Sequence, residues 1–206
     1  MAKITLYGPV YSRACRCLWA LEESGLAYDH IKTSMRGDVK EPEFLAINPN
    51  GRVPALVDGD LKLFESLAIN SYVVKKAGGE IAPRDAAEAA LADQWSLWAM
   101  TEVEKPLLMA LFHSLGIMGY EQDPAIVAER MAELDRPFKV IDAHLAGKDW
   151  LMGGRFTLAD LNAASVLAWA KTGRLDLSAY PNLKRWLDAC FARPAYGRVK
   201  EMLKAG

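Results

Sequence analysis

The pattern of apolar and polar positions divides the chain near residue 80. Before that point the sequence predicts a short apolar strand at 4–7, a helix at about 13–24 and an extended segment at 28–32. Strand and helix signals that alternate in this way are typical of a sheet flanked by helices.

Two more apolar runs, 54–57 and 61–64, flank Asp58-Gly59, a dipeptide favoured in tight hairpin turns. We therefore expect these runs to pair as antiparallel strands. A helix is predicted from Ser66 to Lys76, and it ends before Gly78-Gly79.

Beyond this point the pattern is helical. The segment from Asp85 to about Leu115 is long and amphipathic, and a bend is expected at Pro106 because proline cannot donate the helical hydrogen bond. A second helix is predicted to begin at Asp123-Pro124, with a kink or a break at Pro137. Its apolar positions recur at spacings of three and four residues: Val127, Met131, Leu134, Phe138, Ile141 and Leu145.

Another helix start is predicted at Phe156-Thr157-Leu158-Ala159-Asp160, where Thr157 caps the helix and Asp160 bonds back to the cap. The nearly apolar run that follows indicates a central, buried helix. Two final helices are expected at about 181–192 and 195–204.

These elements predict an α/β part followed by an all-α part. We expect one domain at residues 1–79 and a second at residues 85–206, joined by the linker Gly78-Gly79-Glu80-Ile81-Ala82-Pro83.

Composition and charge narrow the range of partners. The formal net charge is −1 over 206 residues with no basic patch, so nucleic acid is not an expected partner. Apolar stretches fall short of the roughly 20 residues of a membrane span. We expect no signal peptide, because the charged Lys3 precedes a strand of only a few residues. With three cysteines in no disulfide pattern, we expect a cytoplasmic protein that does not bind membranes. His30, His113 and His144 are scattered, so no metal is expected.

Ser12 and Cys15 are the first candidates for chemistry. They lie where the strand at 4–7 gives way to a helix, and exposed amides and the helix dipole favour a negative charge there. Dithiol oxidoreductases with the thioredoxin fold carry Cys-x-x-Cys at such a junction, whereas this chain has Ser12 in the first position. Cys15 and Cys17 are two residues apart and face different ways on a helix. The expected substrate is therefore a thiol from solution, stabilised as a thiolate by the Ser12 hydroxyl.

Three motifs resemble the cytosolic glutathione S-transferases. They are Asn48-Pro49-Asn50-Gly51-Arg52-Val53-Pro54-Ala55-Leu56, then Phe64-Glu65-Ser66-Leu67-Ala68-Ile69, then Phe156-Thr157-Leu158-Ala159-Asp160. The resemblance covers the whole chain, and Ser12 makes it closest to serine-type, bacterial or theta-like members. It implies a thioredoxin-like N-terminal domain, an all-helical C-terminal domain, a homodimer and glutathione as co-substrate.

The resemblance also implies which residues bind glutathione. The Val53-Pro54 bond would be cis, and the backbone of Val53 would pair with the cysteinyl unit. Glu65 would bind the γ-glutamyl ammonium, and Ser66 would bind the γ-glutamyl carboxylate. Lys40 and Arg52 would steer the glycyl carboxylate.

Ser12 occupies the place of the catalytic serine in the serine-type members. Tyr7 and Tyr11 are alternatives, since other members use a tyrosine, and Cys15 is a rival nucleophile that would form a mixed disulfide with glutathione. Lowering a thiol pKa by about two units requires roughly 2.7 kcal/mol of differential stabilisation. One good hydrogen bond and a helix terminus can supply this.

The family architecture implies a site for the second substrate near Tyr11 and the long helix. Met109, Phe112 and His113 on that helix are soft or aromatic side chains that suit an apolar electrophile. We predict an enzyme that transfers activated glutathione to a small electrophile, by conjugation or by peroxide reduction, halide displacement, isomerisation or ether cleavage. The alternatives are a non-catalytic ligand-binding protein of the same fold, and a glutathione-dependent thiol transferase or peroxidase that uses Cys15.

Overall fold

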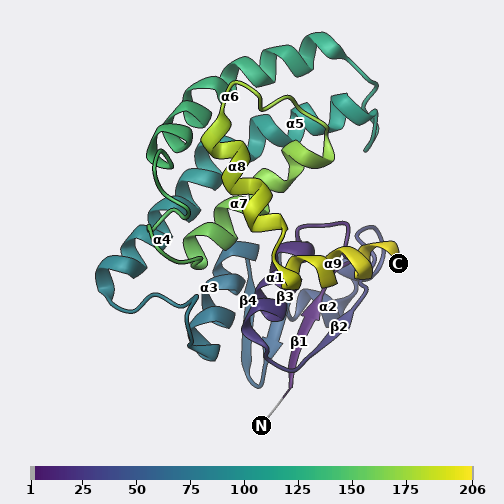
Figure 1. The fold of residues 1–206 in the computed structure, drawn as a ribbon. Coiled ribbons are helices and arrows are strands. Elements are labelled where there is room, and N and C mark those ends of the chain that lie inside the picture. The colour runs from purple at the N-terminus through teal and green to yellow at the C-terminus, as the bar shows by residue number, and fades with distance from the viewer. Residues whose placement is uncertain (1–2, 206) are drawn as a thin grey trace. The chain divides into compact units, whose positions relative to one another are not determined.

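The computed structural model describes residues 3–205, which form two compact units. Residues 3–82 and 192–205 make the first unit, and residues 83–191 make the second. The chain therefore leaves the first unit once and returns to it with its last helix. Among the described residues, all four strands belong to the first unit (Figure 1).

The first unit is a four-stranded sheet with helices on it. Strand order is β2-β1-β3-β4, with β1 parallel to β2 and the other pairs antiparallel. The predicted hairpin is confirmed, since Ala55 pairs with Phe64 and Asp58 with Leu61 across the turn. The elements are β1 (Ile4–Tyr7), α1 (Ala14–Ser24), β2 (Tyr28–Ile31), the 3₁₀ helix η1 (Asp38–Lys40), α2 (Pro42–Leu45), β3 (Ala55–Asp58), β4 (Leu61–Phe64), α3 (Ser66–Ala77) and α9 (Pro194–Lys204).

The two faces of the sheet are buried differently. Ile4 and Leu6 are buried on the face covered by α1 and α3, which pack against each other. Successive side chains on a strand point to opposite faces, so Tyr7 lies on the other face. Its ring meets that of Phe44 edge-on at 6.0 Å, in a small apolar core around Val39. The sheet is thus covered on both faces.

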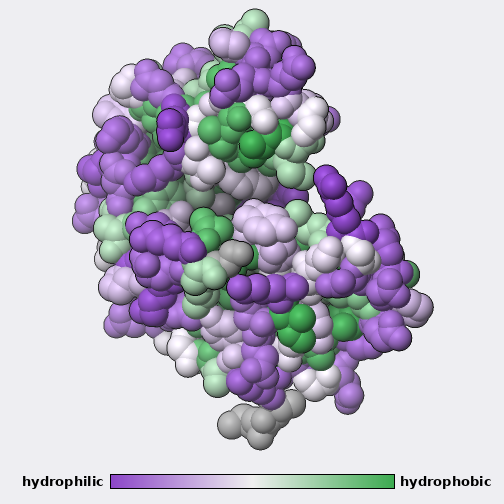
Figure 2. All heavy atoms as spheres, turned by 90° about the vertical axis from the view of Figure 1, so that its right-hand side faces the viewer, coloured by the Kyte–Doolittle hydropathy of each residue, from purple (hydrophilic) through white to green (hydrophobic). Residues whose placement is uncertain are grey.

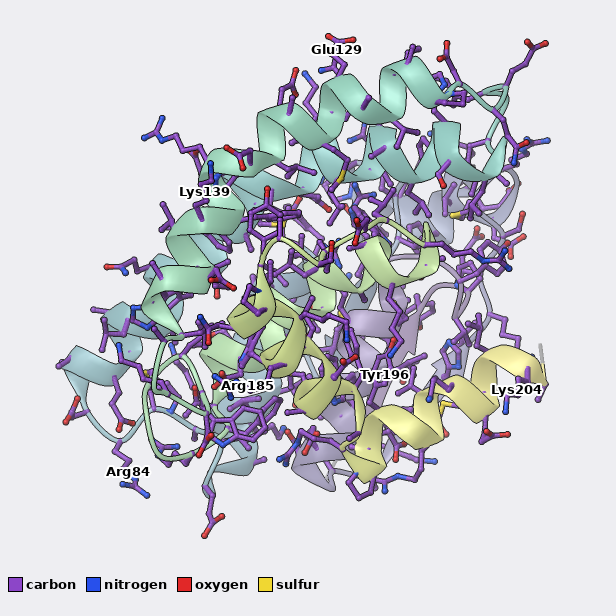
Figure 3. All side chains as sticks on the ribbon, turned by 45° about the horizontal axis from the view of Figure 1, so that its top comes forward. Arg84, Glu129, Lys139, Arg185, Tyr196 and Lys204 are labelled. Atoms are coloured by element: carbon purple, nitrogen blue, oxygen red, sulfur yellow. The ribbon has the colours of Figure 1, made fainter. Side chains whose placement is uncertain are left out.

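Helix α9 packs along α1. The rings of Trp19 and Tyr196 lie 4.8 Å apart between their centroids, and Tyr196 is labelled on α9 in Figure 3. Arg193 donates two hydrogen bonds to the carboxylate of Glu23, at 2.6 and 2.8 Å. A paired guanidinium and carboxylate of this kind fix both position and orientation. The last helix therefore covers one face of α1.

The second unit is helical. Its elements are α4 (Ala86–Trp98), the π-helical turn η2 (Ala99–Val103), α5 (Glu104–Leu115), α6 (Pro124–His144), α7 (Leu158–Thr172) and α8 (Pro181–Phe191). The irregularity expected at Pro106 takes the form of the π turn that directly precedes α5. Proline lacks the N–H that would bond to residue 102, and a wider turn accommodates its ring.

Helix α6 runs without interruption through Pro137, which is buried (Figure 1). A break at this position, one of the two outcomes predicted from the sequence, is therefore wrong. The end of α6 is held from α8, where Arg185 donates to the carbonyl oxygens of Leu145 at 3.1 Å and Lys148 at 2.6 Å (Figure 3). A cation is favourable at a helix C-terminus because the free carbonyls carry partial negative charge.

Helix α7 begins with the predicted capping box. The Asp160 carboxylate accepts from the backbone N–H of Thr157 at 2.9 Å and from that of Leu151 at 2.7 Å. It also accepts from the indole N–H of Trp186 at 2.9 Å. Burial raises the pKa of the Asp160 carboxyl, and these hydrogen bonds lower it. One buried carboxylate thus joins α7, α8 and the segment before α7.

We expect Asp160→Asn to lower the free energy of unfolding by about 2–4 kcal/mol, because an amide nitrogen would face donors that need an acceptor. Urea denaturation at pH 7 measures the change. Asp149→Asn is the matched control, since the Asp149 side chain is 86% exposed, and it should change stability by less than about 0.5 kcal/mol. Equal effects of the two variants would contradict this role of Asp160.

Candidate active site

Ser12 lies in the turn that joins β1 to α1. Its hydroxyl donates to the carbonyl oxygen of Pro9 at 2.7 Å and accepts from the backbone N–H of Ala14 at 3.1 Å. The side chain is half-buried. A hydroxyl at the start of a helix satisfies an amide that has no partner within the helix. The same hydroxyl and amides can stabilise an anion at this place.

Gly8 allows the Ser12 turn to approach the loop that carries Val53. Gly8 has φ of 134°, and a Cβ atom built on it would lie 2.9 Å from the Cβ of Ala14 and 3.0 Å from that of Val53. A side chain has no room there, so only glycine lets the two backbones come this close. The structure thus brings the Ser12 turn and Val53 together, as a shared site requires.

The loop before β3 is held by a buried asparagine. Asn48 donates from its amide to the carbonyl oxygen of Arg52 at 2.6 Å and accepts from the backbone N–H of Asn50 at 3.1 Å. The bond between Val53 and Pro54 is cis, which confirms that prediction. Sequence reasoning did not single out Asn48 as a positioning residue. The available signal was the turn-forming run of asparagine, proline and glycine at 48–51.

Lys40 and Arg52 both lie beside this loop. Both side chains are exposed. The Lys40 ammonium lies 3.1 Å from the point that a Cβ on Gly51 would occupy, so Lys40 and the residue preceding Arg52 are neighbours. Cations that stay in solvent can attract a carboxylate without a large desolvation cost.

Glu65 and Ser66 form the start of α3. Glu65 is exposed and has φ of 68°, a value that non-glycine residues rarely adopt. Such a backbone costs on the order of 1–3 kcal/mol and is found most often where a site requires it. Ser66 is 3% exposed, and its hydroxyl accepts a hydrogen bond from the buried guanidinium of Arg16 at 3.3 Å. Arg16 lies in the first turn of α1 and Ser66 is the first residue of α3, so this contact joins the starts of two helices that pack together.

Cys15 lies on a different face of α1 from Arg16. The negative charge of a Cys15 thiolate would raise the pKa of Tyr196 on α9, although burial is the larger cause of the rise to about 12. Burial also raises the pKa of the Cys15 thiol, against an opposing effect of the Arg16 charge, and raises that of Cys17 further. A thiol with a raised pKa that lies near a tyrosine of another helix resembles a packed side chain more than a nucleophile.

Tyr7 and Tyr11 differ in their surroundings. The Tyr7 ring is packed against Phe44 in the small apolar core beneath η1 and α2. Tyr11 is 69% exposed, in the same turn as Ser12.

The residues predicted to contact a second substrate lie on two units. Tyr11 belongs to the first, and Met109, Phe112 and His113 belong to α5 of the second. His113 is buried, and its Nδ1 lies 3.1 Å from the carbonyl oxygen of Glu121. Phe112 stacks on Tyr120 at 5.5 Å between ring centroids. Tyr120 thus joins this aromatic group. No helical periodicity pointed to it, because Tyr120 lies beyond the end of α5.

Apolar side chains are also exposed on the surface of the second unit, among them Leu91, Leu97, Ile117 and Val140. The upper part of Figure 2 shows one apolar patch of this unit, surrounded by hydrophilic residues. Within residues 3–205, no group of three His, Cys, Asp or Glu side chains is arranged to hold a metal ion. In the same range, no helix is both long and apolar enough to cross a membrane.

Comparison with known proteins identifies the family. Residues 2–75 match the model of the glutathione S-transferase N-terminal domain, and residues 103–194 match that of the C-terminal domain. Glutathione S-transferase 3 of Zea mays is 37% identical, with 97% of this chain and 94% of the relative covered. The chain belongs to the glutathione S-transferase family. The family resemblance read from the three sequence motifs is therefore confirmed.

Solved glutathione S-transferases share the whole fold. Glutathione S-transferase I from maize, in complex with an atrazine glutathione conjugate, superposes with a TM-score of 0.87 at 36% identity, covering 98% of this chain and 99% of that one. A theta class glutathione S-transferase from Xanthomonas axonopodis pv. citri, with glutathione bound, gives 0.85 at 33% identity, covering 96% and 97%. The predicted fold class, a thioredoxin-like domain followed by an all-helical one, is confirmed.

This glutathione S-transferase has three free cysteines among its described residues, Cys15, Cys17 and Cys190. The raised pKa values of the first two lead to a prediction about their reactivity. At pH 7 we expect Cys15 and Cys17 to react with a disulfide reagent at least about tenfold more slowly than in urea, because the thiolate is the reactive form and both pKa values are raised. Absorbance of the released thiolate follows the reaction, and urea-unfolded protein provides the full count. A thiol that reacts as fast in the native protein as in urea would contradict the expectation.

Proposed function

We propose that the protein is a glutathione transferase that uses Ser12 to activate the thiol of glutathione and transfers the sulfur to a small, apolar electrophile. The observation that carries this proposal is the placement of the Ser12 hydroxyl at the start of α1, in a turn that Gly8 holds against Val53. Glutathione S-transferase I from maize was solved with an atrazine glutathione conjugate, which supports conjugation as the reaction.

The chemistry begins with ionisation of the thiol. A free thiol has a pKa of about 8.5 and is only a few per cent ionised at pH 7. The thiol proton passes to water, and the Ser12 hydroxyl, which donates to the carbonyl oxygen of Pro9 in this structure, turns to the sulfur and donates a charge-assisted hydrogen bond to the thiolate. The thiolate then attacks an electrophilic carbon, and the leaving group departs with its electron pair. The product is a thioether.

The rest of glutathione is held by the groups around this turn. The exposed carboxylate of Glu65 binds the γ-glutamyl ammonium, and the hydroxyl and backbone N–H of Ser66 bind the γ-glutamyl carboxylate. The backbone of Val53 pairs with the cysteinyl unit, next to Pro54. Lys40 and Arg52 attract the glycyl carboxylate. The strained φ of Glu65 supports a binding role for this helix start.

The family resemblance implies that Tyr11 and residues of α5 contact the second substrate. Tyr11 shares its turn with Ser12 and is exposed. Met109, Phe112 and His113 offer a polarisable thioether and two rings, which suit an apolar molecule.

We assign the protein to the serine type of the family, with a theta-like site. The likeness to the theta class enzyme of Xanthomonas axonopodis pv. citri supports this assignment. Tyr7 is less suited to catalysis because its ring is packed against Phe44, and Cys15 because its thiol pKa is raised. A non-catalytic ligand carrier and a Cys15-dependent thiol transferase are therefore the less favoured functions.

We further propose two domains in the sequence, at 1–79 and 85–206, of which the last helix, α9, packs on α1 of the first unit. We also propose a cytoplasmic location, no metal requirement and a homodimer. Exposed apolar side chains on both units support self-association: Leu61 and Phe64 lie on the edge strand β4, and Leu91 and Leu97 on α4.

Replacing Ser12 with Ala should lower turnover by about 10²-fold or more and return the pKa of bound glutathione toward 8.5, because one charge-assisted hydrogen bond is lost. Thiolate absorbance of the glutathione complex, titrated against pH, measures the pKa in native protein and variant. Ser12→Thr keeps the hydroxyl and serves as the control. A depressed pKa that survives in Ser12→Ala would remove Ser12 from the mechanism, and absence of glutathione binding by the native protein would refute the proposed function.

The homodimer has its own test. We expect sedimentation velocity of the native protein to give twice the chain mass at micromolar concentration, and Leu97→Glu to weaken association at least about tenfold, because a charge would be buried in an apolar contact. Leu203→Glu on α9 is the control, since Leu203 is also exposed. A native protein of single chain mass at all concentrations would exclude the dimer.

A further inference from the structure

Arg16 is a buried cation at the start of α1 whose role the proposed mechanism leaves open. Its side chain is 1% exposed, although arginine is rarely buried without partners. Removing a guanidinium from water costs several kcal/mol unless hydrogen bonds replace the lost hydration. One of its hydrogen bonds reaches the Ser66 hydroxyl, where Arg16 Nη1 lies 3.3 Å from Ser66 Oγ. The buried charge therefore ends on the first residue of α3.

The chemistry of the two groups sets the direction of this hydrogen bond. A guanidinium has only donors, so Arg16 must donate and the Ser66 oxygen must accept. A hydroxyl that accepts from one side keeps its single hydrogen for an acceptor on another side. A donor that is charged also polarises the hydroxyl and strengthens the bond that the hydroxyl donates.

The backbone of Ser66 is tied to α1 as well. The Cys17 thiol lies 3.5 Å from the carbonyl oxygen of Ser66, so consecutive residues of α1 contact the two oxygens of the same serine. Arg16 contacts the hydroxyl, and Cys17 contacts the main chain. These two contacts allow packing at Ser66 to be tested apart from the hydrogen bond to its hydroxyl. Removing the Cys17 thiol disturbs the α1–α3 contact but leaves the Ser66 hydroxyl and the Arg16 guanidinium in place.

We propose that Arg16 is a positioning residue that turns the Ser66 hydroxyl into a committed donor toward a carboxylate, and so makes the site selective for thiols that carry a γ-glutamyl group. The inference rests on the proposed glutathione-binding role of Ser66. Arg16 does not touch the reacting sulfur in this assignment. It acts through Ser66, so it should affect recognition of the γ-glutamyl end more than the chemical step.

The test compares glutathione with cysteinylglycine, which has the same thiol and glycyl carboxylate but no γ-glutamyl group. The ratio of kcat/KM for the two thiols measures recognition of that group. Arg16→Met should lower the ratio by about tenfold, which is the usual effect of losing a hydrogen bond to a charged group. The loss should come from a higher KM for glutathione, with kcat changed by less than about threefold.

Coupling to Ser66 gives a second readout. If Arg16 acts through the hydroxyl, Ser66→Ala should lower the ratio by itself, and adding Arg16→Met to Ser66→Ala should lower it little further. Arg16→Lys keeps a cation and a donor, so it should restore part of the ratio. Arg16→Gln is a second neutral variant for the case in which Arg16→Met does not fold.

Cys17→Ala is the matched control, because it alters packing at Ser66 without altering the hydroxyl. It should leave the ratio within about twofold of that of the native protein, as expected of a weak thiol hydrogen bond. An unchanged ratio in a folded Arg16→Met or Arg16→Gln, or an equal loss in Cys17→Ala, would overturn the proposal. Failure of the native protein to use glutathione at all would instead refute the proposed function.

Discussion

The close approach of two backbone segments at Gly8 is the constraint on which the candidate site depends. The Ser12 turn and the Val53 loop come from separate parts of the first unit's sequence, and at Gly8 the space between them is too small for a methyl group. The residue also has φ of 134°, which side chains disfavour. A hydroxyl that stabilises a thiolate and a backbone that binds the peptide carrying this thiol must lie within one molecule's reach. Gly8 makes that spacing possible.

The electrostatic potential at the candidate site depends on the N-terminal ends of two helices. The Ser12 turn leads into α1, and Glu65-Ser66 lead into α3, so each helix directs amide N–H groups toward a possible anion. The buried Arg16 adds a full positive charge between them. Glutathione carries two carboxylates and becomes more negative when its thiol ionises, so this arrangement favours the ionised form. The cysteines of α1 do not share this effect to the same extent, because burial dominates their pKa values.

The helical unit depends on a different kind of contact. Asp160 is buried and accepts hydrogen bonds from the start of its own helix, from the preceding segment and from Trp186 on α8. A buried carboxylate is stable only where donors surround it, so this residue specifies how three segments meet. The motif that contains Asp160 also helped to recognise the family. The family's sequence signal in the helical unit therefore comes from residues that stabilise the fold.

Many local features of this protein follow from short stretches of its sequence. The strand at 4–7, the hairpin at Asp58-Gly59, the capping box at Thr157 and the cis bond before Pro54 are all present. These features depend on torsion angles and hydrogen bonds within a few residues, so short motifs predict them. The motifs around Val53, Ser66 and Asp160 were also sufficient to identify the family.

Other features were decided only by tertiary structure. Arg16 looks like a solvated charge in the sequence, yet it is buried because α3 supplies an acceptor fifty residues away. Pro137 does not break α6, and α9 packs on α1, where Tyr196 meets Trp19. Each of these outcomes depends on which distant segment covers a given face. Burial and long-range hydrogen bonds make that choice, and no local pattern records it.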